Sequence, residues 1–202
     1  SSQNSLEISE NTAGVLVNVD AAINDGTSTA DQGIFYSLSS SGDRSNLTIN
    51  GSTGELSFSS TPDFESPQDA DSDNVYNVVV NISDGVITVR QNIAITVTNV
   101  NEGAPSITST NTLLLDENSS DIKVVETNDP DGNSGLTFAI VGGADQGDFI
   151  IDSNTGELSL NFTPDFENPR DNDLDNSYIV QVSVTDGTFS DTQTITFDVS
   201  DV

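Results

Sequence analysis

Residues Thr61–Gly85 read "TPDFESPQDADSDNVYNVVVNISDG", and residues Thr163–Gly187 read "TPDFENPRDNDLDNSYIVQVSVTDG". The two segments align without a gap at an offset of 102 residues, and 15 of their 25 positions are identical. Similarity at a fixed spacing along a chain is typical of repeated structural units. Because 202 residues suffice for two domains, we predict homologous domains over residues 1–98 and 106–202, joined by a linker at residues 99–105.

Each copy ends in alternating apolar residues, which is the pattern of a β-strand with one buried face. Tyr76, Val78, Val80 and Ile82 occupy every second position of the first copy. Similar alternation, or a short apolar run bounded by turn residues, occurs at Tyr178–Val184, Ile93–Val97, Ile195–Val199, Val15–Val19, Phe35–Leu38, Leu47–Ile49 and Leu56–Phe58. About seven short strands per repeat predict an all-β fold, built as two tandem Greek-key seven-stranded β-sandwich domains.

The composition is strongly acidic, with 33 Asp and Glu, 4 Lys and Arg, no His and a formal net charge of −29. Nucleic acid and anionic lipid both attract basic surfaces, so we expect no nucleic-acid partner and no direct membrane insertion. Cys is absent, which excludes disulfides and Cys-based metal or nucleophile sites. Cations are the natural counterpart of such a chain.

The acidic residues that recur at fixed positions need a more specific explanation than solubility. Two unit charges about 4 Å apart repel by roughly 1 kcal/mol in water and about 4 kcal/mol at an effective dielectric constant near 20. Calcium takes six to eight oxygen ligands, mainly carboxylates and carbonyls, and would turn this repulsion into attraction. The alternative is that the acids only keep a secreted or salt-adapted protein soluble.

Short motifs occur in a fixed order along the chain: "SEN" at Ser9–Asn11, "DFE" at Asp63–Glu65, "SDG" at Ser83–Gly85, "NVNEGAP" at Asn99–Pro105, "DPD" at Asp129–Asp131 and "TDG" at Thr185–Gly187. In this order they resemble the cadherin repeat family in its bacterial form, over nearly the whole chain. The resemblance implies about three Ca²⁺ ions at the junction between consecutive domains, and it implies that these ions align the domains.

The resemblance also implies the ligands of this junction, which come from both domains and from the linker: Glu10, Asp63, Glu65, Asn99, the backbone carbonyl of Val100, Asn101, Glu102, Asp129, Asp131 and Asp186. Three linker positions depart from the family pattern, and one of them is Gly103, which replaces Asn. Asn99 and Glu102 stand where the family has Asp, and the neutral amide of Asn99 makes a weaker ligand for a cation.

Two acidic loops follow the DFE motifs and form a separate candidate. Asp69, Asp71 and Asp73 alternate with other residues, as do their copies Asp171, Asp173 and Asp175. Alternating acids of this kind resemble the first half of a calcium loop and predict additional Ca²⁺ ions. The alternative is a solvated loop in which Asp and Asn shape the turns.

The second domain repeats the first half of the junction set at Glu117, Asp165 and Glu167. These acids would serve a further linker, as in a longer array of repeats. Asp201 aligns with Asn99 and the sequence given stops at Val202, so we expect weak or no occupancy by calcium there.

The resemblance implies an extracellular location, secreted or at the cell surface, and a role in adhesion or cell–cell interaction within a larger protein. The expected partners are neighbouring repeats and homophilic contacts. The alternative is a carbohydrate-binding module of a bacterial polysaccharide-associated protein. Trp is absent, so we do not predict the strand exchange that vertebrate cadherins perform with an N-terminal Trp.

We predict no enzymatic activity. The DFE acids could pass for a catalytic carboxylate pair, but no His, Cys or Trp is present to shape a pocket around them. We expect Tyr36, Tyr76 and Tyr178 to lie in the cores, and Phe64 and Phe166 to anchor their loops there.

Overall fold

The computed structural model describes residues 5–19 and 33–202. The chain divides into two units, Ser1–Val100 and Asn101–Val202, so the division falls within residues 99–105. None of the described residues belongs to a helix that is long and apolar enough to cross a membrane. The only helical segments in the described part are two three-residue 3₁₀ helices, η1 (Arg44–Asn46) and η2 (Gln146–Asp148).

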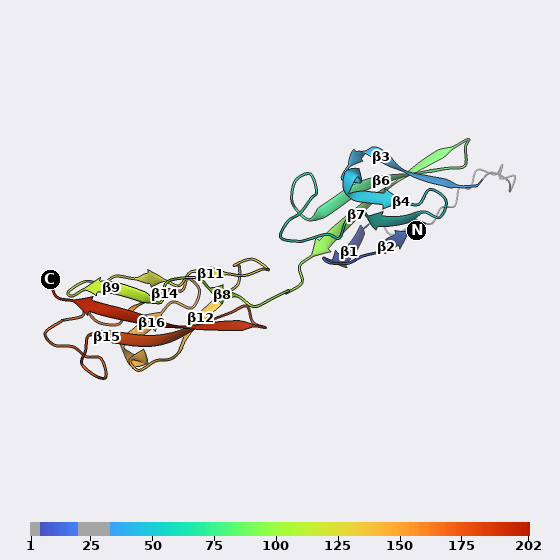
Figure 1. Ribbon diagram of the computed structural model, residues 1–202. Helices are drawn as coiled ribbons and strands as arrows, with labels where there is room; N and C mark the ends of the chain where they lie inside the picture. Colours follow the sequence, from blue (N-terminus) through green and yellow to red (C-terminus); the bar gives the residue numbers. More distant parts are fainter. Residues whose placement is uncertain (1–4, 20–32) are drawn as a thin grey trace. The chain divides into compact units, whose positions relative to one another are not determined.

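The described part of the first unit contains two packed sheets (Figure 1). One sheet has the strand order β1-β7-β6-β3 and the other has the order β2-β5-β4. β1 runs parallel to β7, whereas the other pairs are antiparallel. The strands are β1 (Ser5–Ser9), β2 (Val15–Asn18), β3 (Phe35–Gly42), β4 (Leu47–Ile49), β5 (Glu55–Phe58), β6 (Val75–Ser83) and β7 (Thr88–Thr98).

The second unit repeats this topology with the orders β9-β16-β15-β12 and β10-β14-β13, and a small additional pair is formed by β11 and β8. β9 again runs parallel to its neighbour β16. The strands are β8 (Ser106–Ile107), β9 (Thr112–Asp116), β10 (Lys123–Val124), β11 (Thr127–Asn128), β12 (Thr137–Gly142), β13 (Phe149–Ile151), β14 (Glu157–Leu160), β15 (Ser177–Thr185) and β16 (Ser190–Ser200).

The nine short segments of the second unit correspond to seven strands, two of which are divided. The first strand changes partner, because β8 pairs with β11 whereas β9 pairs with β16. The second strand is divided in the same way, since β10 pairs with β14 and β11 with β8. The sandwich topology predicted from the alternating pattern is confirmed in both units.

The cores consist of the predicted alternating residues. Tyr76, Val78, Val80 and Ile82 are at most 4% exposed, and the matching residues of β15 are fully buried. Burying a side chain of this size stabilises a fold by roughly 1.5–3 kcal/mol. Tyr36, Phe64 and Phe166 are partly buried and pack against the cores. The predicted anchoring of the two acidic loops by a phenylalanine is therefore confirmed.

Candidate metal centres

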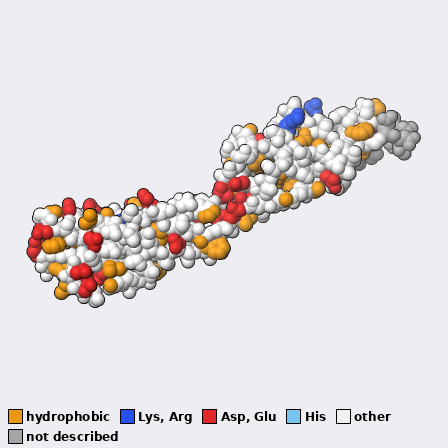
Figure 2. Space-filling model, viewed as in Figure 1, with side chains coloured by type: hydrophobic (Ala, Val, Ile, Leu, Met, Phe, Trp, Pro, Cys, Tyr) orange, Lys and Arg blue, Asp and Glu red, His pale blue; other side chains and the backbone are white. Residues whose placement is uncertain are grey.

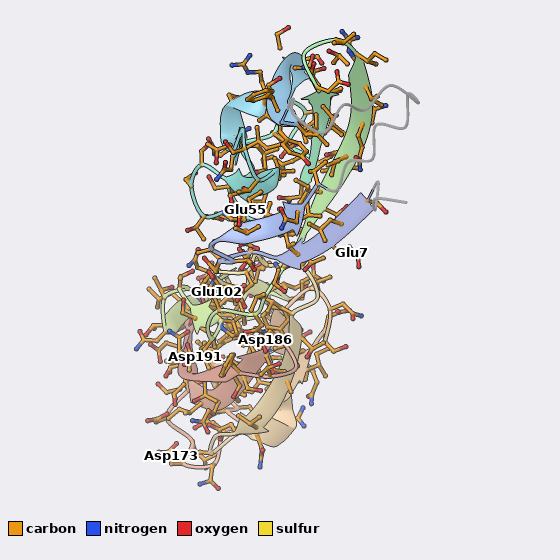
Figure 3. All side chains as sticks on the ribbon, turned by 90° about the vertical axis from the view of Figure 1, so that its right-hand side faces the viewer. Glu7, Glu55, Glu102, Asp173, Asp186 and Asp191 are labelled. Carbon is orange, nitrogen blue, oxygen red and sulfur yellow. The ribbon has the colours of Figure 1, made fainter. Side chains whose placement is uncertain are left out.

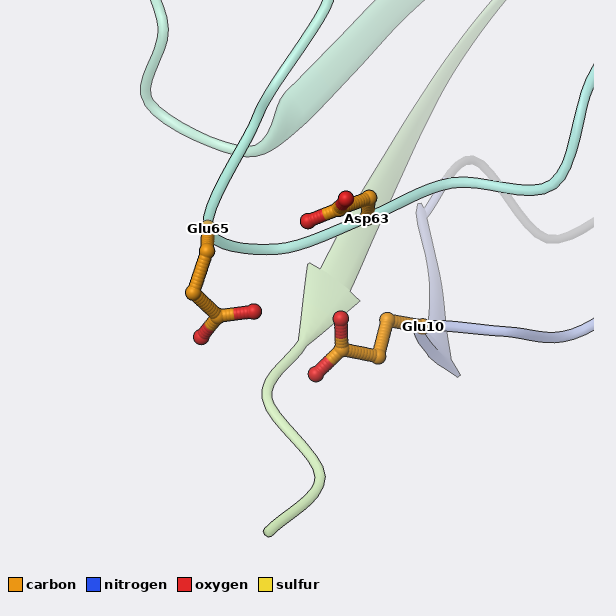
Figure 4. Close-up of side chains that lie close together, drawn as sticks. All are labelled: Glu10, Asp63 and Glu65. Atoms are coloured by element: carbon orange, nitrogen blue, oxygen red, sulfur yellow. The ribbon is translucent and has the colours of Figure 1, made fainter. Parts of the chain in front are cut away.

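The first acidic group lies at one end of the first unit. Glu10, Asp63 and Glu65 each offer a carboxylate oxygen, and these three oxygens lie within 4.8 Å of one another. Figure 4 shows the three side chains converging from two separate segments of the chain. Glu10 follows β1, whereas Asp63 and Glu65 belong to the loop between β5 and β6. The structure thus brings the acids of the SEN and DFE motifs together, and their role as calcium ligands stays a prediction.

Glu10 is the structural centre of this group, since its side chain is only 3% exposed. Its Oε2 accepts the backbone N–H of Phe64 at 2.9 Å, and its Oε1 accepts the backbone N–H of Val100 at 2.8 Å. The amide of Asn99 donates to Glu65 Oε1 at 2.6 Å. Hydrogen bonds to the side chains of Glu10 and Glu65 therefore connect the end of β1, the DFE loop and the residues after β7.

The linker residues on the other side of the Val100–Asn101 bond contact acids of the second unit. Asp131 accepts the backbone N–H groups of Glu102 at 2.7 Å and of Gly103 at 3.3 Å. The backbone N–H of Phe189 holds the pKa of Asp186 below its ordinary value, and the side chain of Asn101 lowers this pKa further. Figure 3 shows Glu102 and Asp186 toward one end of this unit and Asp173 at the other end.

Asp129 is a buried acid of the second unit whose two carboxylate oxygens differ in their contacts. The residue is 7% exposed, and its Oδ1 accepts the backbone N–H of Asp131 at 2.8 Å. Within the part of the chain that the structure describes, its Oδ2 is buried and has no hydrogen-bond partner. A buried carboxylate oxygen in this state is unfavourable unless a cation or a proton compensates it. Asp129, Asp131 and Asp186 do not form a three-carboxylate group as tight as the one at Glu10.

The end of the second unit repeats the Glu10 arrangement. Glu117, Asp165 and Glu167 offer oxygens within 4.8 Å of one another. Glu117 is 8% exposed, and it accepts the backbone N–H of Phe166 at 3.1 Å and that of Val202 at 3.3 Å. Val202 thus takes the role that Val100 has in the first unit. The expected weak occupancy of this group by calcium stays a prediction.

Both acidic loops gather their carboxylates. Asp69, Asp71 and Asp73 form one group within 4.8 Å, and Asp171, Asp173 and Asp175 form another. The first acid of each loop is buried, whereas the others are exposed. The charge of Asp73 raises the pKa of Asp71, and that of Asp175 raises the pKa of Asp173. On the visible face, Figure 2 shows many acidic side chains and few basic ones.

Two buried acids hold these loops in place and were missed by the sequence analysis. Asp43 is 6% exposed, and its carboxylate accepts the backbone N–H of Ala70 at 2.9 Å and of Asn77 at 2.7 Å. Asp145, 102 positions later, is 5% exposed and accepts the equivalent two bonds. Extending the repeat alignment toward the N-terminus would have paired these two residues.

The geometry thus defines a protein of repeated β-sandwiches that carry clusters of carboxylates in the loops beside their strands. Residues 111–200 match the family model described as "Cadherin domain". The second unit thus matches a cadherin domain over most of its length, and the described part of the first unit has the same topology.

Solved structures share the fold at low sequence identity. The protocadherin GammaB4 extracellular domain matches with a TM-score of 0.71 and 18% identity, over 96% of this chain and 33% of that chain. Mouse cadherin-23 EC22-24 matches with a TM-score of 0.64 and 21% identity, over 100% of this chain and 64% of that one.

Curated relatives match over small parts of their own length. Halomucin of Haloquadratum walsbyi is 41% identical over 61 residues, which is 30% of this chain and 1% of halomucin. Cadherin EGF LAG seven-pass G-type receptor 2 of Mus musculus is 28% identical over 173 residues, which is 82% of this chain and 6% of the receptor. None of these comparisons supports the alternative function as a carbohydrate-binding module.

Proposed function

We propose that the chain is a pair of extracellular calcium-binding repeats that become rigid when Ca²⁺ binds, and that it serves adhesion or cell–cell interaction within a larger protein. The observation that carries the proposal is the group of Glu10, Asp63 and Glu65, whose oxygens lie within 4.8 Å of one another around a buried glutamate. The role is structural and does not involve catalysis.

The residues present fit a hard cation. All side-chain donors in the group are carboxylate oxygens, which Ca²⁺ prefers. Without a cation, each pair of charges about 4 Å apart would repel by roughly 4 kcal/mol at an effective dielectric constant near 20. The chain has only 4 basic residues to offset its 33 acids, and none of the four lies within Thr61–Tyr76.

The proposed ligands lie on both sides of one peptide bond. Val100 binds Glu10 of the first unit, and the next residues contact Asp186 and Asp131 of the second unit. We propose that cations held by both sets of acids restrict rotation about this linker. Binding that occurs only in an ordered state stabilises that state, so calcium affinity and linker order would be coupled.

A calcium titration by calorimetry, after removal of metal with a chelator, tests the proposal. We expect about three ions at the linker, as is implied for the family, with affinities in the range of extracellular calcium modules, about 10⁻⁴–10⁻³ M, or tighter. Glu65→Gln and Asp131→Asn should each lower the ion count. Glu7→Gln is the matched control, because Glu7 is exposed on β1 and belongs to none of the acidic groups.

Small-angle scattering with and without Ca²⁺ measures the mechanical part of the proposal. The wild-type protein should become stiffer on addition of Ca²⁺, and Asp131→Asn should abolish that change. Calcium-dependent aggregation of beads that carry the protein then tests homophilic adhesion. Equal ion counts and equal scattering for the wild type and both variants would contradict the proposed linker site.

A further inference from the structure

The loop at residues 69–74 of the first unit contains an acidic group that shares no residue with the linker site. Asp69, Asp71 and Asp73 offer oxygens within 4.8 Å of one another. Asp69 is only 6% exposed, and its Oδ1 is buried without a hydrogen-bond partner among the described residues. We propose that this loop binds a divalent cation of the calcium type within the first unit, separately from the ions at the linker.

The position of Asp69 is fixed by its neighbours on both sides. The backbone N–H of Gln68 donates to the hydroxyl of Tyr76 at 3.0 Å, and that of Ala70 donates to Asp43 at 2.9 Å. Tyr76 and Asp43 are both buried, so the loop backbone is bonded to the core on each side of Asp69. The backbone of Asp69 therefore cannot move into solvent without breaking these contacts.

Only one of the two carboxylate oxygens of Asp69 has a hydrogen-bond partner in residues 5–19 and 33–202. Its Oδ2 accepts the backbone N–H of Asp73 at 2.8 Å, which folds the loop back toward Asp69. This bond brings the exposed carboxylates of Asp71 and Asp73 close to the buried one. A buried oxygen without a partner is costly, and two further negative charges beside it increase that cost.

A cation is the partner that fits this arrangement best. No Lys or Arg occurs between Thr61 and Tyr76, so no basic side chain of the segment itself can pair with Asp69. Three carboxylates that offer one oxygen each suit a hard divalent ion, which completes its shell with water or backbone carbonyls. The exposed positions of Asp71 and Asp73 leave the group open to an ion from solvent.

The second unit shows why the proposal is limited to the first loop. There, Asp171 Oδ2 accepts the N–H of Asp175 at 2.8 Å, and Asp171 Oδ1 accepts the N–H of Asn176 at 3.3 Å. Both oxygens of this buried carboxylate are therefore satisfied by the protein. In addition, Arg170 stands where the first loop has Gln68.

The test counts Ca²⁺ ions on the full chain by calorimetry and native mass spectrometry, starting from chelator-treated protein. The linker is first disabled with Glu65→Gln and Asp131→Asn, so that the loop is measured independently of the proposed function. This background should still bind calcium in the first loop. Adding Asp71→Asn and Asp73→Asn should lower its count by one ion.

Asn at position 73 keeps an oxygen for the bond that Asp73 Oδ1 accepts from the N–H of Val75 at 2.8 Å, so the loop variant should fold. Circular dichroism spectra and thermal unfolding curves in chelator that match those of the background would verify that the loop variant folds. The control is Glu7→Gln with Asp121→Asn, which removes two exposed charges outside the acidic groups and should leave the count unchanged. An equal count with and without the loop substitutions would overturn the proposal, as would a background that binds no calcium.

Discussion

Replacing the buried Asp145 by Asn should destabilise the second unit by an amount that the structure allows to be estimated. The two carboxylate oxygens accept the backbone N–H groups of Asn172 and Ile179, both at 2.7 Å. In the Asn variant, one oxygen becomes an NH₂ group that faces an N–H donor. One charge-assisted hydrogen bond is lost, and such bonds contribute about 1.5–3 kcal/mol each.

Hydrogen exchange measured by mass spectrometry can follow this loss in each unit separately. A loss of about 2 kcal/mol should accelerate amide exchange in β15 roughly 30-fold, because 1.36 kcal/mol corresponds to a factor of ten. β6 of the first unit serves as the internal control, because it is bonded to Asp43 and not to Asp145. Asp121→Asn is the control for the change of charge at an exposed position.

The reasoning also predicts a lower melting temperature for the second unit, by roughly 10 °C for a domain of this size. Asp145→Ala should have a larger effect, because it leaves both buried N–H groups without an acceptor. Unchanged exchange in β15 would refute the role assigned to Asp145. Equal acceleration in β6 and β15 would also refute it, since the bond concerned belongs to the second unit alone.

Three further substitutions test other contacts. Tyr178→Phe removes the buried hydroxyl that accepts the N–H of Arg170 at 2.9 Å, and should cost about 1 kcal/mol in urea unfolding. Asp152 is exposed, and the N–H groups of Asn154 and Thr155 lower its pKa. Its contribution to stability is therefore present above the ordinary pKa of an aspartate and is lost as the pH falls through the lower folded pKa. Asp152→Asn should remove this part of the acid sensitivity, and Asn50 at the matching turn of the first unit has no such dependence. Gly143→Ala places a Cβ 2.5 Å from the carbonyl oxygen of Ile179 at a residue with φ of +111°, and thermal unfolding should show a loss of roughly 1–3 kcal/mol.

The β-sandwich could be predicted from sequence because its strongest elements carry a local signal. In β6 and β15 every second residue is apolar, from Tyr76 to Ile82 and from Tyr178 to Val184, and this is the face that is buried. The division of the first two strands of the second unit carries no such signal. β10 and β11 are two residues long each, and their partners are decided by long-range pairing.

The acidic groups were predictable only in part for a similar reason. The acids of SEN and DFE can be identified in the sequence because each belongs to a short motif, and the structure places these acids together. Asp43 and Asp145 belong to no motif, and an isolated Asp in sequence is usually a surface residue. Their burial depends on backbone N–H groups that are contributed by residues 27 and 34 positions away. Such a partner becomes visible only when the fold is known.

The residues that are identical in the two copies of the repeated stretch fall into two classes, those that the fold requires and those that it does not. Tyr76 and its copy are buried and bind the loop backbone. Asn74 and Asn176 have φ of 63° and 70°, a conformation that Asn tolerates better than most residues. These identities are explained by the fold alone.

The exposed acids Asp71 and Asp73 differ from those residues, because the fold does not require three carboxylates close together. Their charges lie within 4.8 Å of one another and of Asp69, so they oppose the folding of the cation-free protein. A solvated loop could be shaped equally well by Ser or Asn, which form the same turns without the repulsion. In the first loop, where Oδ1 of the buried Asp69 has no hydrogen-bond partner among the described residues, the clustered acids therefore favour a bound cation over solubility, which any exposed position could supply.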